Sequence, residues 1–412
     1  MFSTFEHLLT CLRQLPEDEK LALLQKIPAP DWNKILQLAK PHGLTPNLYH
    51  ALKPYKEKLE ISEDVFSELR RLYFHSAARN MRFFGELERL LHCFNREKIP
   101  VALLKGAHLA EAVYGNIALR SMIDIDLLVR ESDLEKADTL LLAQGAQPHA
   151  KQRIKSAKGK HFSYTLPAKK IFLELHWDPI NGEGNGISAT MLWSRLDCLG
   201  LGSEKALALK PIDLIPYLCL HLAEHLHELC LRMLYDLDVI IRFYGDKLDW
   251  RQIVATAREW NGEAATYVFL AISADFFKTP VPRNVLDMLT PENIDTADLD
   301  RIAGLFKNDF EETGDSLPTP GVSLWWETKG IRKKAALVFK RLIPPPGTLS
   351  ATYGAPPGSW RRFAYYPLYL RDLCRWRIAA LLSLILGRRE TRNSARQISE
   401  TETMRRKLLH RA

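Results

Sequence analysis

Residues 103–129 of the chain are LLKGAHLAEAVYGNIALRSMIDIDLLV, and this stretch decides the fold. It begins within the apolar run IPVALLK at 99–105, which predicts a short buried strand. GAHLAEAVYG then predicts a helix that ends near Gly115. SMIDIDLLVR at 121–130 alternates apolar and polar side chains and predicts a second strand. The order strand, glycine turn, helix and strand is typical of a small α/β unit.

The chain that follows extends this unit by a helix and two strands. SDLEKADTLLLAQGA predicts a helix, because Ser132 and Glu135 have the spacing of a capping box. HFSYTLP at 161–167 and IFLELHW at 171–177 are joined by the short link PAKK and predict a β-hairpin. We therefore expect a core at 96–185 that contains a small mixed sheet.

Helical patterns flank this core on both sides. Residues 1–95 and 186–278 have apolar residues at helical spacing, which predicts an N-terminal helical region and a separate helical domain. Proline clusters predict an irregular connector at 279–360, and a basic amphipathic tail follows at 361–412, whose last twenty residues we expect to be disordered. The predicted fold class is thus α+β, a mixed-sheet core between helical regions.

Composition limits the function classes. The 412 residues carry a net charge of +8, which favours polyanionic partners such as nucleotides, nucleic acid or an anionic membrane surface. None of the six cysteines forms a C-x-x-C pair, and the N-terminus lacks the basic start of a signal peptide, so we predict a reducing cytoplasm. The longest apolar run, near 378–387, is too short for a transmembrane segment.

Two acidic residues on the second predicted strand indicate a metal-binding site. Asp124 and Asp126 are two positions apart, so both side chains leave the same face of a strand, while Ile123, Ile125 and Leu127 occupy the other. Neighbouring carboxylates repel each other unless a cation lies between them. Mg²⁺ prefers such oxygen ligands, and paired ions can bind both oxygens of an in-line displacement. The alternative is that D-I-D marks a strand end with both acids solvated.

The surrounding residues favour the metal interpretation. Lys105 and Gly106 stand where a strand meets a helix, and a helix N-terminus after a glycine suits a phosphate. Arg120 precedes the acidic strand and is a candidate triphosphate ligand. Glu174 lies on the later strand IFLELHW and would supply a third carboxylate.

Together these motifs resemble the uncharacterised nucleotidyltransferase family of the DNA polymerase beta-like superfamily. The LKG turn, the tyrosine-to-arginine segment, the D-x-D-L-L-V strand and the E-L-H-W strand all match that family, and the resemblance extends over roughly residues 30–260. It implies that Asp124, Asp126 and Glu174 bind metal and that Lys105 and Gly106 open the phosphate turn. In the wider superfamily the turn is Gly-Ser or Gly-Gly, whereas here Ala107 follows the glycine, so a serine hydroxyl is missing.

Three further motifs have competing interpretations. HLAEH at 221–225 has the H-x-x-E-H arrangement of zinc peptidases, but no third ligand follows, and buried histidines are the favoured interpretation. His161 and His176 would flank Glu174 if the hairpin register aligns them, and would then orient it or the acceptor. The tail segment RRFAYYPLYLRDLCRWRIAALLSLILGRR suits a membrane surface, nucleic acid or the protein's own core.

The sequence therefore predicts a metal-dependent nucleotidyltransferase. We expect it to transfer NMP from an NTP to an acceptor with release of pyrophosphate, using Mg²⁺ or Mn²⁺. The sequence does not identify the acceptor, which is a small molecule, a protein or an RNA end. Two alternatives remain, a catalytically inactive nucleotide-binding regulatory module and a membrane-associated partner protein that acts through its basic tail by peripheral contact.

Overall fold

The computed structural model describes residues 3–27, 30–149, 161–166, 171–179, 189–307, 365–368, 371 and 389–409. Contacts group residues 1–149, 158–309 and 405–412 into one compact unit and residues 150–157 and 310–404 into a second. All residues of the candidate site belong to the first unit.

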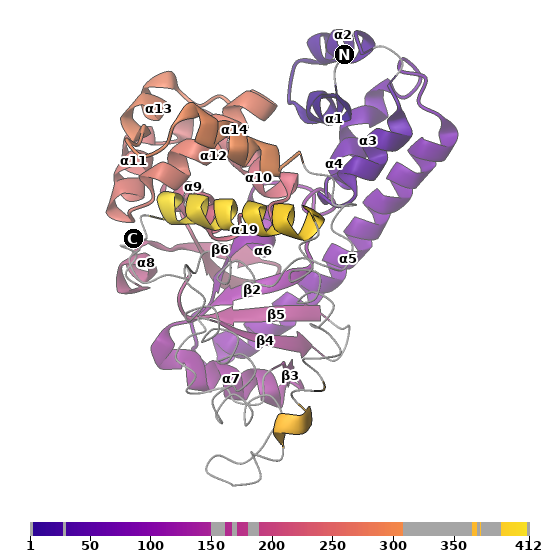
Figure 1. The fold of residues 1–412 in the computed structure, drawn as a ribbon. Coiled ribbons are helices and arrows are strands. Elements are labelled where there is room, and N and C mark those ends of the chain that lie inside the picture. Colours follow the sequence, from indigo (N-terminus) through magenta and orange to yellow (C-terminus); the bar gives the residue numbers. More distant parts are fainter. Residues whose placement is uncertain are drawn as a thin grey trace. The chain divides into compact units, whose positions relative to one another are not determined.

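The N-terminal region is helical, as the sequence predicts (Figure 1). Its helices are α1 (Thr4–Leu12), α2 (Glu17–Gln25), α3 (Trp32–Ala39), α4 (Thr45–Leu52) and α5 (Glu63–Arg96). Ser62 occupies the N-cap position of α5, which continues for 34 residues. Leu87, Leu90 and Phe94 recur at helical spacing near its C-terminal end and are fully buried, so this end of α5 packs on the core.

A mixed sheet forms the centre of the first unit. Seven strands pair in the described part of the chain: β1 (Ala102–Leu103), β2 (Asp124–Leu128), β3 (Gln147–Pro148), β4 (His161–Leu166), β5 (Ile171–His176), β6 (Asp197–Leu201) and β7 (Glu204–Ala208). Their order is β3-β4-β5-β2-β1-β7-β6. β2 lies between β1, to which it is antiparallel, and β5, to which it is parallel. The predicted hairpin is confirmed as β4 and β5.

The sequence analysis missed the strands β6 and β7. It placed residues 197–208 in the helical domain 186–278, yet they form a hairpin whose second strand pairs with β1. β6 is mostly exposed and gives little apolar signal. The turn did carry a signal, because Gly202 and Ser203 separate two short strand-like runs, and Gly202 has a φ of +58°. The sheet therefore extends past the predicted end of the core at 185.

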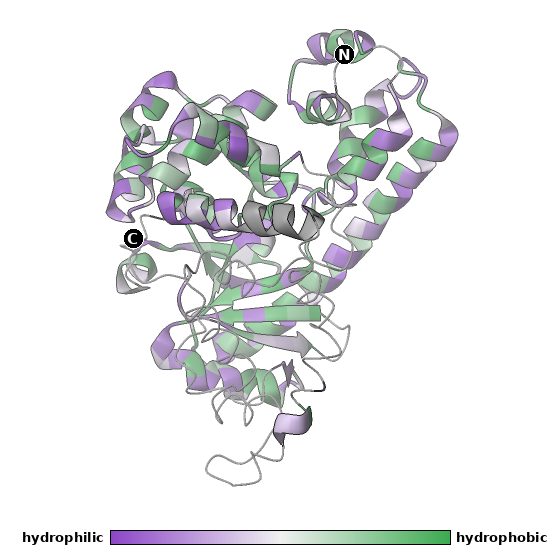
Figure 2. Cartoon of the chain, in the orientation of Figure 1, coloured by the Kyte–Doolittle hydropathy of each residue, from purple (hydrophilic) through white to green (hydrophobic). Residues whose placement is uncertain are grey.

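The two faces of the sheet differ in chemistry. Ile125 and Leu127 of β2 and Leu173 and Leu175 of β5 are fully buried in one cluster with side chains of α5 and α7 (Leu134–Ala143). Hydrophobic residues predominate along these central strands (Figure 2). The acidic residues point to the other face. Ile123 precedes β2 and, against the prediction, is 64% exposed.

The start of α7 also differs from the prediction. A 3₁₀ turn at Glu131–Asp133 precedes the helix, and Asp133 takes the N-cap position without a side-chain hydrogen bond. Ser132 therefore does not form a capping box.

Further helices lie between β5 and β6 and after β7 in the chain. They are α8 (Ala189–Arg195), between β5 and β6, and then α9 (Pro211–Glu224), α10 (Leu231–Tyr244), α11 (Trp250–Glu259), α12 (Glu263–Phe277), α13 (Arg283–Leu289) and α14 (Thr296–Leu305). The last two lie where the sequence predicted an irregular connector from 279, so that prediction is wrong for 279–307. Residues 308–360, the rest of the predicted connector, lie outside the described residues.

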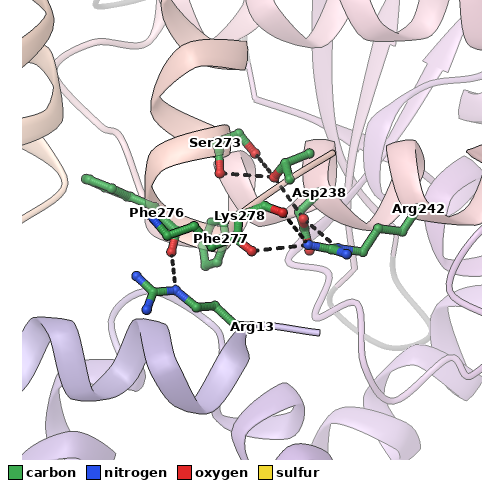
Figure 3. A network of polar contacts seen from close by, with 8 residues as sticks. Arg13, Asp238, Arg242, Ser273, Phe276, Phe277 and Lys278 are labelled. Atoms are coloured by element: carbon green, nitrogen blue, oxygen red, sulfur yellow. Dashed lines mark hydrogen bonds and ion pairs between the residues drawn. The ribbon is translucent and has the colours of Figure 1, made fainter. Parts of the chain in front are cut away.

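A partly buried polar network fixes the end of α12 (Figure 3). Arg242 of α10 donates to Asp238 Oδ1 at 2.8 Å and to the carbonyl oxygen of Lys278 at 2.8 Å. Arg13 donates to the carbonyl oxygen of Phe276 at 2.8 Å. Carbonyl groups at the C-terminal end of a helix find no N–H donor within the helix, and here two arginines donate to them. The network joins the N-terminal helices to the region after the sheet.

The tail ends in a helix, contrary to the prediction of disorder for the last twenty residues. α19 (Arg389–Leu408) ends with Leu408 fully buried, and Lys407 Nζ lies 2.7 Å from Asp298 Oδ2 of α14. The apolar part of the predicted amphipathic tail, at 372–388, lies outside the described residues. In the parts that are described, no helix combines the length and hydropathy of a bilayer span.

Candidate active site

The strand register brings the predicted acidic residues together. Asp126 of β2 pairs with Glu174 of the parallel strand β5, and Asp124 precedes Asp126 by two positions. Side chains at such positions share a face of the sheet, so the three carboxylates lie side by side. The arrangement follows from the D-x-D pattern and from the parallel contact between β2 and β5, which the sequence alone could not show.

Lys105 and Asp126 form a buried ion pair. Lys105 Nζ lies 3.2 Å from Asp126 Oδ1, and both side chains are largely buried. Burial alone would raise the pKa of Asp126, but the Lys105 ammonium and His176 hold it well below its usual range. Lys105 has a φ of +46°, which is uncommon outside glycine and is found at strained functional positions. Asp126 is therefore an ionised carboxylate with a fixed position.

The pKa of Asp124 shifts in the opposite direction. Burial, then the charges of Asp126 and Glu174, raise its pKa to about 6. Its ionised form is thus disfavoured in the protein alone. A cation between these carboxylates would remove the repulsion, because an opposite charge nearby favours ionisation.

Two histidines surround Glu174, and the conditional prediction about the register is confirmed. His161 of β4 pairs directly with His176 of β5, and their ring centroids are 5.1 Å apart. His176 Nε2 lies 3.0 Å from Asp126 Oδ1 and 3.3 Å from Glu174 Oε2. His161 Nε2 lies 3.7 Å from Glu174 Oε1. His176 therefore joins the carboxylates of neighbouring strands.

The titration of the two histidines differs. Burial opposes protonation of His176, but its hydrogen bonds with Asp126 and Glu174 raise its pKa. Burial lowers the pKa of His161, which keeps this ring neutral near pH 7. The hydrogen bond with His176 lowers the pKa of Glu174.

The glycine turn after β1 is tightly packed. α6 (Lys105–Ala112) begins at the turn, as predicted, and Ala107 is buried in the hydrophobic cluster. A Cβ on Gly106 would lie 3.2 Å from Met122 Cγ, so packing alone is a reason for glycine at this position. The first N–H groups of α6 have no acceptor within the helix, which leaves them suited to an anion.

Arg120 lies beside the glycine turn, where its Nη1 would be 3.7 Å from a Cβ on Gly106, but its guanidinium is held by other groups of the protein. Its side chain is buried, and its Nε lies 2.8 Å from Asp236 Oδ1 of α10. Nη1 donates to the carbonyl oxygen of Ser121 at 2.8 Å. Tyr114 donates to the same Asp236 at 2.7 Å. Arg120 thus joins the loop before β2 to α10, and its role as a triphosphate ligand stays a prediction.

The HLAEH motif lies at the C-terminal end of α9. The ring centroids of His221 and His225 are 4.4 Å apart. Burial and then the nearby Lys105 ammonium lower the pKa of His221 well below its usual value. Neither histidine belongs to a group of potential metal ligands in the described part of the chain, whereas His161, Glu174 and His176 do. The structure thus gives no zinc site here, but it also differs from the buried-histidine interpretation, because both side chains are partly exposed, that of His225 by 39%.

The sequence analysis missed two arginines beside the acids. A cleft of about 620 Å³ is lined by Arg79 and Arg82 of α5 together with Asp124 and Glu174. Helical periodicity placed the arginines on α5 but gave no indication of what that part of the helix faces. Their spacing of three positions, which puts both on one helix face, was the available signal.

The donor set fits a divalent cation. His161, Glu174 and His176 each offer one ligand atom, and these atoms all lie within 4.8 Å of one another. Asp124 adds a carboxylate destabilised by its neighbours. Lys105 and His176 both contact Oδ1 of Asp126, so Oδ2 is the atom that a cation would take. Oxygen donors suit Mg²⁺ or Mn²⁺, and the imidazole of His161 would favour Mn²⁺ of the two.

The family of the chain agrees with this site. Residues 28–278 match a family described as uncharacterised nucleotidyltransferase. The match spans well over half of the chain, the whole sheet and every site residue named above. No curated protein matches the chain. The chain therefore belongs to the uncharacterised nucleotidyltransferase family.

Proposed function

We propose that the protein transfers NMP from an NTP to an acceptor and releases pyrophosphate. The observation that carries this proposal is the gathering of Asp124, Asp126 and Glu174 on one sheet face, next to the first turn of α6. An acceptor oxygen forms the new bond to the α-phosphorus, and the bond from that phosphorus to the bridging oxygen of pyrophosphate breaks. Bound Mg²⁺ or Mn²⁺ would supply charge stabilisation for both oxygens.

Each acidic residue has its own part in this proposal. Asp124 and Asp126 hold the cations, and Glu174 adds a ligand and accepts the acceptor's proton beside the neutral His161. His176 is a positioning residue, because it contacts both Asp126 and Glu174. These contacts keep the carboxylates in place before substrate binds, which lowers the cost of reorganisation.

The turn at the start of α6 is the proposed site for the donor phosphates. The free N–H groups of Lys105, Gly106 and Ala107 and the positive end of the helix favour an anion. The Lys105 ammonium adds a charge next to the cation ligands. We assign no phosphate contact to Arg120, although it lies next to this turn, because Asp236 pairs with its guanidinium.

Glu174→Gln tests the proposed division of roles. We expect this variant to bind NTP within about threefold of the wild type but to lose on the order of 10²-fold or more in turnover, because Glu174 acts mainly in the transition state. Binding is measured by isothermal titration calorimetry and turnover by transfer from α-labelled NTP.

Asp178→Asn is the matched control, since this acid lies beyond the end of β5. It is expected to keep both binding and turnover. If Asp178 proves essential and Glu174 dispensable, the assignment of the third carboxylate is wrong.

A further inference from the structure

The cleft beside the carboxylates has a second wall that the proposed reaction does not use. Its lining includes the first residues of β2 and β5, Asp124 and Ile171, and it faces Arg79 and Arg82 of α5. The volume of about 620 Å³ falls in the range of small-molecule sites. Lys105 and Gly106 are not part of its lining.

The arginines of this wall lack acidic partners. In the part of the chain that the structure describes, no carboxylate lies within ion-pair distance of Arg79 or Arg82, although α5 pairs Arg71 with Glu68. Arg79 Nε is buried and has no hydrogen-bond partner there. Burial and the charges of Arg232 and Arg82 lower the pKa of Arg79. Like charges gathered in this way favour an anion between them.

The geometry of a guanidinium group indicates which kind of anion would bind here. Its planar fork of N–H donors matches the paired oxygens of a phosphate or carboxylate. Among the described residues, Arg82 donates only through Nε, in a 3.3 Å bond to the carbonyl oxygen of Ala78. Its two terminal nitrogens are therefore available for a ligand.

The cleft also exposes two large apolar side chains. Ile123 is 64% exposed and Phe172 is 51% exposed, and both line it. His149 lies edge-on to Phe172, with ring centroids 5.6 Å apart. Exposed aromatic and aliphatic surface next to arginines suits a flat ring, since bases stack on aromatic side chains.

The sheet topology separates this cleft from the donor turn. β1, which α6 follows, lies on one side of β2, whereas β5 and β4 lie on the other. The cleft is lined by Ser163 of β4 and Phe172 of β5, so it flanks the acids on the side away from α6. A donor bound at the turn would leave the cleft to the second substrate.

We propose that the Arg79–Arg82 cleft binds a phosphate-bearing acceptor with a flat ring, that is, a nucleotide unit. The unit is either a free nucleotide or the end of an RNA. The term acceptor rests on the proposed function, whereas binding of a nucleotide phosphate in the cleft does not.

Calorimetric titration in EDTA tests the proposal with AMP, inorganic phosphate and a six-residue oligoadenylate as probes. AMP is expected to bind more tightly than phosphate. Arg79→Ala and Arg82→Ala are each expected to weaken AMP binding about tenfold, because each removes a charged hydrogen-bond donor. Arg71→Ala, on the same helix, is the matched control and is expected to bind AMP as the wild type does. Arg82 is exposed, so its variant keeps the test valid if the Arg79 variant unfolds.

The oligoadenylate arm identifies the source of the nucleotide unit. Binding tighter than that of AMP, with the same dependence on Arg82, indicates an RNA end, and equal or weaker binding indicates a free nucleotide.

The proposal is overturned if no probe binds or if Arg71→Ala weakens binding as much as Arg82→Ala. It is also overturned if a non-hydrolysable NTP analogue with Mn²⁺ displaces AMP competitively, because the cleft would then hold the donor. Loss of NMP transfer with Arg82-dependent AMP binding intact would count against the proposed function alone.

Discussion

Asp124→Asn is expected to abolish NMP transfer, by about 10³-fold or more, without lowering the unfolding temperature. The loss follows because a cation ligand contributes several kcal/mol to the transition state. Stability is spared because burial and the charges of Asp126 and Glu174 already disfavour the ionised Asp124. A neutral amide removes this repulsion, so the temperature stays equal or rises. Label transfer and thermal unfolding in EDTA measure the two effects.

Asp126→Asn is expected to differ from Asp124→Asn in its effect on stability. It should also lose activity, but it leaves the buried Lys105 ammonium without its carboxylate. Removing one partner of a buried ion pair is destabilising, by about 3–5 kcal/mol where the pair is fully buried. If both variants keep wild-type stability, or if Asp124→Asn is the less stable of the two, our description of the site electrostatics is wrong.

Asp236→Ala is expected to have the largest effect on stability. Asp236 accepts from both Arg120 and Tyr114, and all three side chains are strongly desolvated. Its removal leaves a buried guanidinium unpaired, so we expect the free energy of unfolding to fall by about 3–5 kcal/mol. Urea denaturation measures this value.

Asp246→Ala, an exposed acid just beyond the end of α10, is the control and is expected to change stability by less than about 0.5 kcal/mol. A loss below about 1 kcal/mol for Asp236→Ala would mean that Arg120 finds water or another acceptor. Arg120 would then again be a candidate ligand for the donor triphosphate.

Local patterns predicted the elements that carry the acids. The alternation in 121–130 and the apolar runs at 161–177 gave β2, β4 and β5, because a strand with one buried face has period-two hydrophobicity. The hairpin β6–β7 was missed because its outer strand is largely exposed, and exposure removes that periodicity. The helices at 283–305 were hidden by neighbouring prolines, of which Pro282 is the N-cap residue of α13, whereas α14 begins with a capping box at Asp295.

The parts of the site that depend on distant contacts could not be predicted. Arg120 looked free because its partner Asp236 lies 116 positions away in the chain. Arg79 and Arg82 belong to a helix predicted only as a packing element, and nothing local relates them to Asp124. By contrast, the sequence predicted the β4–β5 hairpin but left its register open, and the structure pairs His161 with His176.

Transfer of label from NTP tests the central claim most directly. The wild-type protein is incubated with Mg²⁺ or Mn²⁺, cell extract as the source of acceptor, and each NTP labelled at the α- or the γ-phosphate, with Asp124→Asn as the inactive reference. We predict that α-label enters an acceptor and that γ-label leaves as pyrophosphate, in the wild type only. Release of inorganic phosphate would instead indicate an NTPase or a kinase. Metal-dependent NTP binding without transfer from any NTP would contradict the claim and identify the protein as a regulatory nucleotide-binding module.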